Sequence, residues 1–148
     1  MKAKDFFMQV QRAEREMKLL KAKQQHYEDL GLQITSHIGG IGGKQRGASK
    51  TEAAAVGYLD STRDLNLQIA EYTALIARAE QVIRSVPQEK YRQILTYRYL
   101  CGWSFRSISD ELQYNDPNSV YRAHGWALTE AQKVLNREEK KNACKDMS

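Results

Sequence analysis

The sequence predicts an all-α protein, in which a long antiparallel, coiled-coil-like helical hairpin precedes a three-helix helix-turn-helix domain. Two observations lead to this prediction. Apolar residues recur at alternating steps of three and four through most of the first 86 residues, which is the period of packed helices. The 148 residues include only two prolines, and five of the nine glycines lie between positions 39 and 47, so helices are interrupted at few places.

Residues 1–86 form the predicted helical arm. One apolar stripe begins at Phe6 and passes through Val10, Ala13, Met17, Leu20 and Tyr27, and a second runs from Tyr58 to Val86, just before Pro87. The glycine-rich segment 36–50 is expected to be a flexible loop between the two helices, with Ser49 or Thr51 capping the second. Because the stripes suit pairing within a chain and between chains equally, a homo-oligomer through the arm stays open.

Residues 87–136 form the predicted helix-turn-helix domain. A helix over Glu89–Leu100 is expected to stop at Gly102, and Ser104 should cap a two-turn helix that ends near Leu112. Asp116 should cap the last helix, with Pro117 at its first position. Residues 137–148 form a charged tail that is expected to fray. Trp103 and Trp126 are expected to be packing residues, and Cys101 is expected to be a small buried apolar residue.

A short helix, a turn and a longer helix with polar residues at its start are typical of the motif that reads the major groove of DNA. The guanidinium of Arg122 can form two hydrogen bonds to guanine, and the amide of Asn118 can pair with adenine. The candidate residues for contacts with double-stranded DNA are Ser104, Arg106, Asn118, Ser119, Tyr121, Arg122, His124 and Gly125.

The words "RYLCGWSFRSIS" and "VYRAHGWAL", with the spacing from Pro87 to Leu128, resemble region four of bacterial sigma factors. They are closer still to phage proteins with a sigma-region-four-like end, the RinA/ArpU-type late transcription regulators and related phage proteins of unassigned function. The resemblance covers about residues 50–135 and implies a phage or prophage transcriptional regulator that binds promoter or operator DNA. Many relatives carry glycine just after the Leu112 position, where this chain has Gln113.

The formal net charge is +5, which permits a polyanionic partner without requiring one. The pattern shows no catalytic set and no metal-ligand cluster, so we expect no enzyme activity, no metal and no cofactor. We also expect no membrane association and a cytoplasmic location in a bacterial host cell. Host RNA polymerase is a candidate partner of the arm. Two alternatives stay open: a phage DNA-packaging or assembly adaptor, and a helical module that binds only protein partners.

Overall fold

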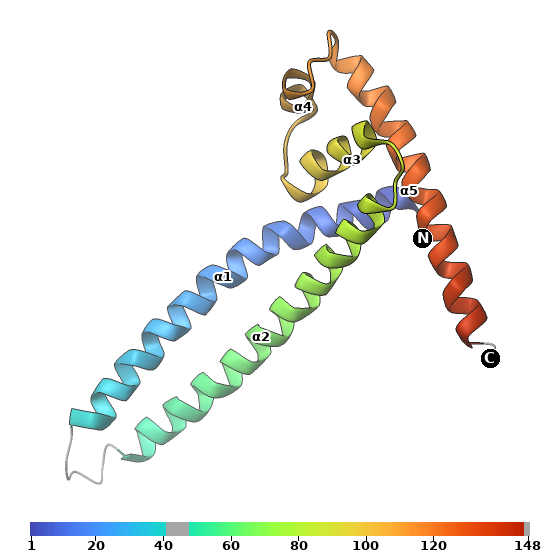
Figure 1. Ribbon diagram of the computed structural model, residues 1–148. Helices are drawn as coiled ribbons and strands as arrows, with labels where there is room; N and C mark the ends of the chain where they lie inside the picture. Colours follow the sequence, from blue (N-terminus) through green and yellow to red (C-terminus); the bar gives the residue numbers. More distant parts are fainter. Residues whose placement is uncertain (41–47, 147–148) are drawn as a thin grey trace. The chain divides into compact units, whose positions relative to one another are not determined.

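The structure, a computed structural model, describes residues 1–40 and 48–146, with side chains described outside 34–40 and 48–51. All regular secondary structure in these residues is helical, which confirms the all-α prediction (Figure 1). The elements are α1 (Ala3–Gly40), α2 (Ala48–Arg84), α3 (Glu89–Leu95), the π-helical η1 (Thr96–Leu100), α4 (Phe105–Glu111) and α5 (Pro117–Asp146). None of the described helices has both the length and the apolar character that a membrane span requires.

The helices form two compact units. Residues Met1–Glu14 and Ala74–Ser148 make one, which contains both chain ends and is called the terminal unit below. Residues Arg15–Thr73 make the other, called the middle unit. The predicted domain boundaries after residues 86 and 136 stay predictions.

The main core of the terminal unit joins the start of α1 to the end of α2 and to α5. Phe6, Phe7 and Val10 are fully buried there, and the Phe7 ring stacks on Tyr99 with 5.0 Å between ring centroids. The other buried members are Ala3, Ala79, Val82, Ile83, Val86, Leu95, Ala127, Ala131, Val134 and Leu135. The first turns of the chain are therefore part of the same core as η1 and α5.

A smaller core holds α4 against α3 and α5. Its buried members are Ile94, Ile108, Val120 and Ala123. Trp103 packs against these residues, and its ring stacks on Tyr97 at a centroid distance of 4.4 Å. This small core holds α4 and α5, the two helices of the predicted helix-turn-helix, in a fixed orientation.

The helix predicted over Glu89–Leu100 changes character halfway. The Cys101 amide donates to the Thr96 carbonyl at 3.0 Å, five residues back, so η1 is wider than an α-helix. Gly102 then adopts φ +74° and ends the helix, as predicted. The prediction that Cys101 is buried is wrong, since its side chain is exposed. The wider turn directs Tyr99 to the core and leaves Cys101 at the helix end, beyond the packed face.

Helix α5 continues through the segment that was expected to fray. Residues 137–146 are helical, so that prediction is wrong for them. Two ion pairs link this stretch to the rest of the terminal unit: Glu138 with Arg78 at 3.7 Å, and Glu139 with the Met1 amino group at 3.0 Å. Each further residue of an existing helix adds a hydrogen bond without a new nucleus, so α5 extends beyond its last buried residue, Leu135.

In the middle unit, α1 and α2 lie side by side and run in opposite directions. The Gln24 amide donates to the Asn66 side chain at 3.4 Å. Closer to the end of α1 and the start of α2, a Cβ at Gly31 would lie 2.6 Å from the Tyr58 hydroxyl oxygen, so the absence of a side chain at Gly31 makes room for the tyrosine ring. Met17, Leu20 and Leu65 are buried along the predicted stripes.

Residues 36–40 and 48–50 of the predicted loop are helical, so the loop prediction is wrong for them. Helix α1 extends to Gly40, and α2 begins at Ala48, so Ser49 and Thr51 lie inside α2 and are not its N-cap. Glycine costs a helix only about 1 kcal/mol relative to alanine, which propagation from an existing helix can offset. The remaining predicted loop residues, 41–47, lie outside the described residues.

Candidate nucleic-acid interface

Helix α4 begins where the sequence predicted. The Ser104 hydroxyl accepts a hydrogen bond from the Ser107 amide at 3.2 Å, which satisfies one of the free amides of the first turn. The same hydroxyl donates to the Ser107 hydroxyl at 3.0 Å. Ser104, predicted as a DNA contact, therefore has a local structural role that accounts for both of its bonds.

The turn between α4 and α5 contains one strained residue. Gln113 has φ +60°, the left-handed region in which a side chain is unfavourable. The Tyr114 amide closes the turn by donating to the Ser109 carbonyl at 2.9 Å. Glycine at this position would relieve the strain.

Asp116 caps α5, as predicted. Its Oδ1 accepts from the Asn118 amide at 3.1 Å, and the helix begins at Pro117. Packing against Ile94 and Ile108 sets which side of the first turns of α5 faces the small core. Val120 and Ala123 point inward, being 0% and 4% exposed. Figure 1 shows α3 and α4 beside this first half of α5.

The opposite side of the same turns is open. Asn118, Tyr121, Arg122 and Gly125 are exposed, and Ser119 is half-buried. A Cβ added at Gly125 would meet nothing within 4 Å, so the backbone here can be approached closely. These five predicted residues lie on one surface of α5, which we call the α5 face.

Two aromatic rings brace the junction of the α5 face with α4. The Tyr121 ring lies 4.5 Å from the Phe105 ring, centroid to centroid, although Tyr121 is 53% exposed. The Arg98 guanidinium covers Phe105 at 4.2 Å from its centroid and donates to the Trp103 carbonyl at 3.0 Å. Arg98 is thus held by structural contacts, whereas Arg106 of α4 is exposed.

His124 differs from the other predicted residues, because it is half-buried and turned toward η1. Its Nε2 lies 2.7 Å from the Tyr99 hydroxyl. Burial, together with the positive charges of Arg98 and Lys4, lowers its pKa to about 4. His124 is therefore neutral at pH 7 and offers no positive charge for a phosphate group.

A shallow hollow borders the α5 face toward α3. It encloses about 230 Å³ and is lined by Lys90, Tyr91, Tyr114, Ser119, Arg122, Ala123 and Trp126. The Lys90 ammonium lies over the Tyr114 ring, 4.4 Å from its centroid, on the same surface as Arg122. A second hollow of about 350 Å³ continues along α5 and shares Tyr91 and Trp126 with the first.

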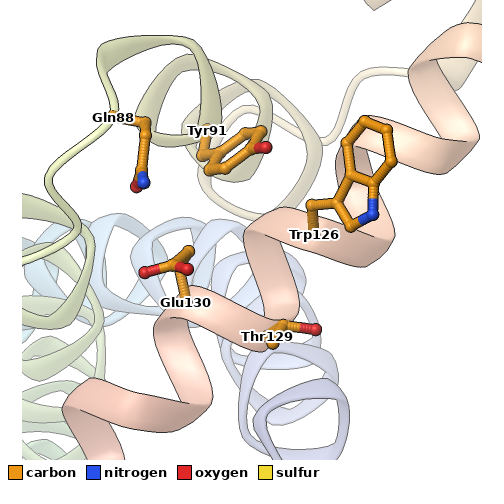
Figure 2. A pocket seen from close by; sticks show the side chains of 5 residues that line it. All are labelled: Gln88, Tyr91, Trp126, Thr129 and Glu130. Atoms are coloured by element: carbon orange, nitrogen blue, oxygen red, sulfur yellow. The ribbon is translucent and has the colours of Figure 1, made fainter.

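Figure 2 shows this second hollow, with Gln88 and Tyr91 on the side of α3 and Trp126, Thr129 and Glu130 on α5. Trp126 is 58% exposed, so the prediction that it is a packing residue is wrong. It lies one helical turn beyond Arg122 and extends the same surface. Sequence reasoning missed Lys90 because only the packing of α3 against α5 brings it beside Arg122. It missed Trp126 because a tryptophan in this position was assigned to the core.

Acidic and basic side chains line two different hollows of the terminal unit. Asp110 and Glu111 line a hollow of about 590 Å³ together with Gly102, Trp103, Ser104 and Ser107. Lys90 and Arg122 line the hollow between α3 and α5 instead. A polyanion is therefore favoured on the α5 face and disfavoured beside Ser104.

The described residues hold no group of three or more histidine, cysteine or acidic side chains arranged to bind a metal ion. No protein-family model, curated protein or solved structure matches the chain. The resemblance to sigma region four and to phage regulators remains a prediction from the sequence.

Proposed function

We propose that the protein binds double-stranded DNA through the α5 face and acts as a phage or prophage transcriptional regulator. In this proposal α4, the turn at residues 112–116 and α5 form a helix-turn-helix, and α5 enters the major groove. The pair α1–α2 serves as a helical hairpin arm, with host RNA polymerase as a candidate partner. The regulatory role is supported by the resemblance of residues 50–135 alone.

One observation carries the proposal of DNA binding. The capped start of α5 buries Val120 and Ala123 and leaves Asn118, Tyr121, Arg122 and Gly125 exposed on one side. A reading helix needs such a division, because its inner side must hold the helix rigidly while its first turns stay free to meet base edges. Among the described residues, Arg122 has no ion-pair partner within the protein.

The proposed contacts divide into base reading and backbone binding. Arg122 and Asn118 lie in the first two turns of α5 and have the donors and acceptors that distinguish guanine and adenine. Arg106 and Lys90 lie on the flanking helices α4 and α3 and supply charge for phosphate groups. Ser104 and His124 are left out, because one caps α4 and the other is neutral and half-buried.

Binding of the full chain to a mixed-sequence duplex of about 30 base pairs at low salt tests the proposal. Wild-type protein should bind, with an affinity that falls as salt rises, and replacing both Lys90 and Arg106 by alanine should weaken binding and make the salt dependence less steep by about two charges. Lys140→Ala with Lys141→Ala is the matched control, because it removes two exposed charges from the far half of α5.

Absence of binding by the wild-type chain at low salt would refute the proposal and favour a module that binds only protein. Equal losses in the Lys90/Arg106 variant and the control would show that charge acts without regard to the α5 face.

A further inference from the structure

The middle unit exposes large apolar side chains that its own helices do not cover. Leu19 of α1 is 53% exposed, and Val56 and Leu67 of α2 are 58% exposed each. The buried side chains Met17, Leu20 and Leu65 lie where α1 and α2 face each other. At about 100° per residue, Val56 and Leu67 point in nearly the opposite direction to Leu65 around the axis of α2. Both helices therefore have an outer face that is partly apolar.

The outer face of α1 is basic. Arg15, Lys18, Leu19 and Ala22 are all exposed and lie on the side of the helix opposite Leu20. Between residues 15 and 23 the helix carries four basic side chains and one acidic side chain, Glu16. We call the side formed by Arg15, Lys18, Leu19 and Ala22 the basic stripe.

The outer face of α2 has the opposite charge. Val56, Asp60, Asp64, Leu67 and Glu71 are exposed and lie on the side opposite Leu65. Between residues 52 and 71 the helix carries four acidic side chains and one basic side chain, Arg63, which is also exposed on this outer side, so the side keeps a net negative charge. We call the side formed by Val56, Asp60, Asp64, Leu67 and Glu71 the acidic stripe.

The two stripes lie at the same level along the long axis of the paired helices in the middle unit. The bond between Gln24 and Asn66 shows which residues of the antiparallel helices lie opposite each other. Counting six residues back from Gln24 along α1 and six residues forward from Asn66 along α2 places Lys18 opposite residue 72, which is next to Glu71. By the same count Ala22 lies opposite residue 68, next to Leu67, and Leu19 lies opposite residue 71, about one turn from Leu67.

We propose that a second copy of this chain covers these faces, with the basic stripe of one copy on the acidic stripe of the next. Two middle units placed side by side in the same direction bring Lys18 to Glu71 of the neighbour, and Leu19 and Ala22 to its Leu67. Pairing two like stripes about a twofold axis would oppose charges of the same sign, which is unfavourable. The contact is therefore head-to-tail, and repeating it gives a closed ring or an open row.

The mass of the full-length protein in solution, measured by light scattering after size exclusion at low salt, tests this inference. Wild-type protein should exceed the mass of one chain in a concentration-dependent way. Arg15→Glu with Lys18→Glu, and separately Asp64→Lys with Glu71→Lys, should each raise the dissociation constant at least about tenfold. Lys140→Glu with Lys141→Glu on α5 is the matched control for the basic-stripe variant and should associate as wild type does. Circular dichroism checks that each variant keeps its helix content.

Mixing the two stripe variants is the decisive experiment. The reversed basic stripe then meets the reversed acidic stripe of the other variant, so association should return. A monomeric wild type at high concentration, stripe variants that associate as wild type does, or a mixture that stays monomeric would each overturn the inference. Leu19→Ser with Leu67→Ser leaves every charge in place, and undiminished association of that variant would also contradict it.

Discussion

Replacing Gln113 by glycine is expected to stabilise the protein. The left-handed backbone at Gln113 costs an L-residue about 1–2 kcal/mol, and glycine avoids that cost. Glycine loses more chain entropy on folding, which takes back about 0.5–1 kcal/mol. Because the Gln113 side chain is exposed, no buried contact is lost. The free energy of unfolding should therefore rise by about 0.5–1 kcal/mol, from the difference of these two effects.

Urea unfolding followed by circular dichroism measures this gain as a higher midpoint at unchanged slope. Gln113→Ala is the control, since it keeps a Cβ and the strain and should change stability by less than about 0.5 kcal/mol. A glycine variant that is less stable than wild type, or an alanine variant as stable as the glycine variant, would refute the left-handed turn between α4 and α5.

Three further predictions concern the terminal unit. Phe7→Ala removes a fully buried ring stacked on Tyr99 and should cost about 3–5 kcal/mol in urea unfolding, whereas a small loss would show that the start of α1 is not part of this core. Asp116→Ala should cost about 0.5–2 kcal/mol, and Asp116→Asn, which can still cap, should cost less. The pKa of His124 is lowered to about 4, so its neutral form is favoured by folding: stability should fall as pH falls from about 6.5 to 4, with uptake of about one proton on unfolding, and His124→Gln should remove that part of the pH dependence. An unchanged pH profile in His124→Gln would contradict the half-buried neutral imidazole.

Local signals in the sequence predicted the start of α4 and α5 correctly. Ser104 and Asp116 cap these helices, and Gly102 ends the preceding one, because each acts through the backbone of its own neighbours. The same local reasoning misjudged the glycine-rich segment and the charged tail. Residues 36–40 and 137–146 continue an existing helix, and the balance between propagation and residue preference cannot be read from composition.

Tertiary packing determines which side chains of α5 are buried and which are exposed, and the sequence alone did not predict this for His124 and Trp126. His124 looked like a surface residue of the reading helix, but the aromatic ring of Tyr99 and the wide turn η1 draw it inward. The sequence predicts Trp126 to be a packing residue, yet it is exposed next to the α5 face, where it lines the same hollow as Lys90 of α3. Periodicity along one helix identifies its inner side, whereas these assignments depend on which neighbouring helix covers which turn.

The central claim, that the α5 face reads DNA, is tested most directly by Arg122→Ala. Duplexes selected by wild-type protein from a random library provide the preferred site, and a scrambled duplex of equal length provides the comparison. If Arg122 reads a base, its loss should cost about 1–3 kcal/mol on the selected site and much less on the scrambled duplex. Arg106→Ala, at a predicted phosphate contact, should weaken both to the same extent. Unchanged affinity of Arg122→Ala for the selected duplex, or failure of wild-type protein to select any sequence, would contradict the claim.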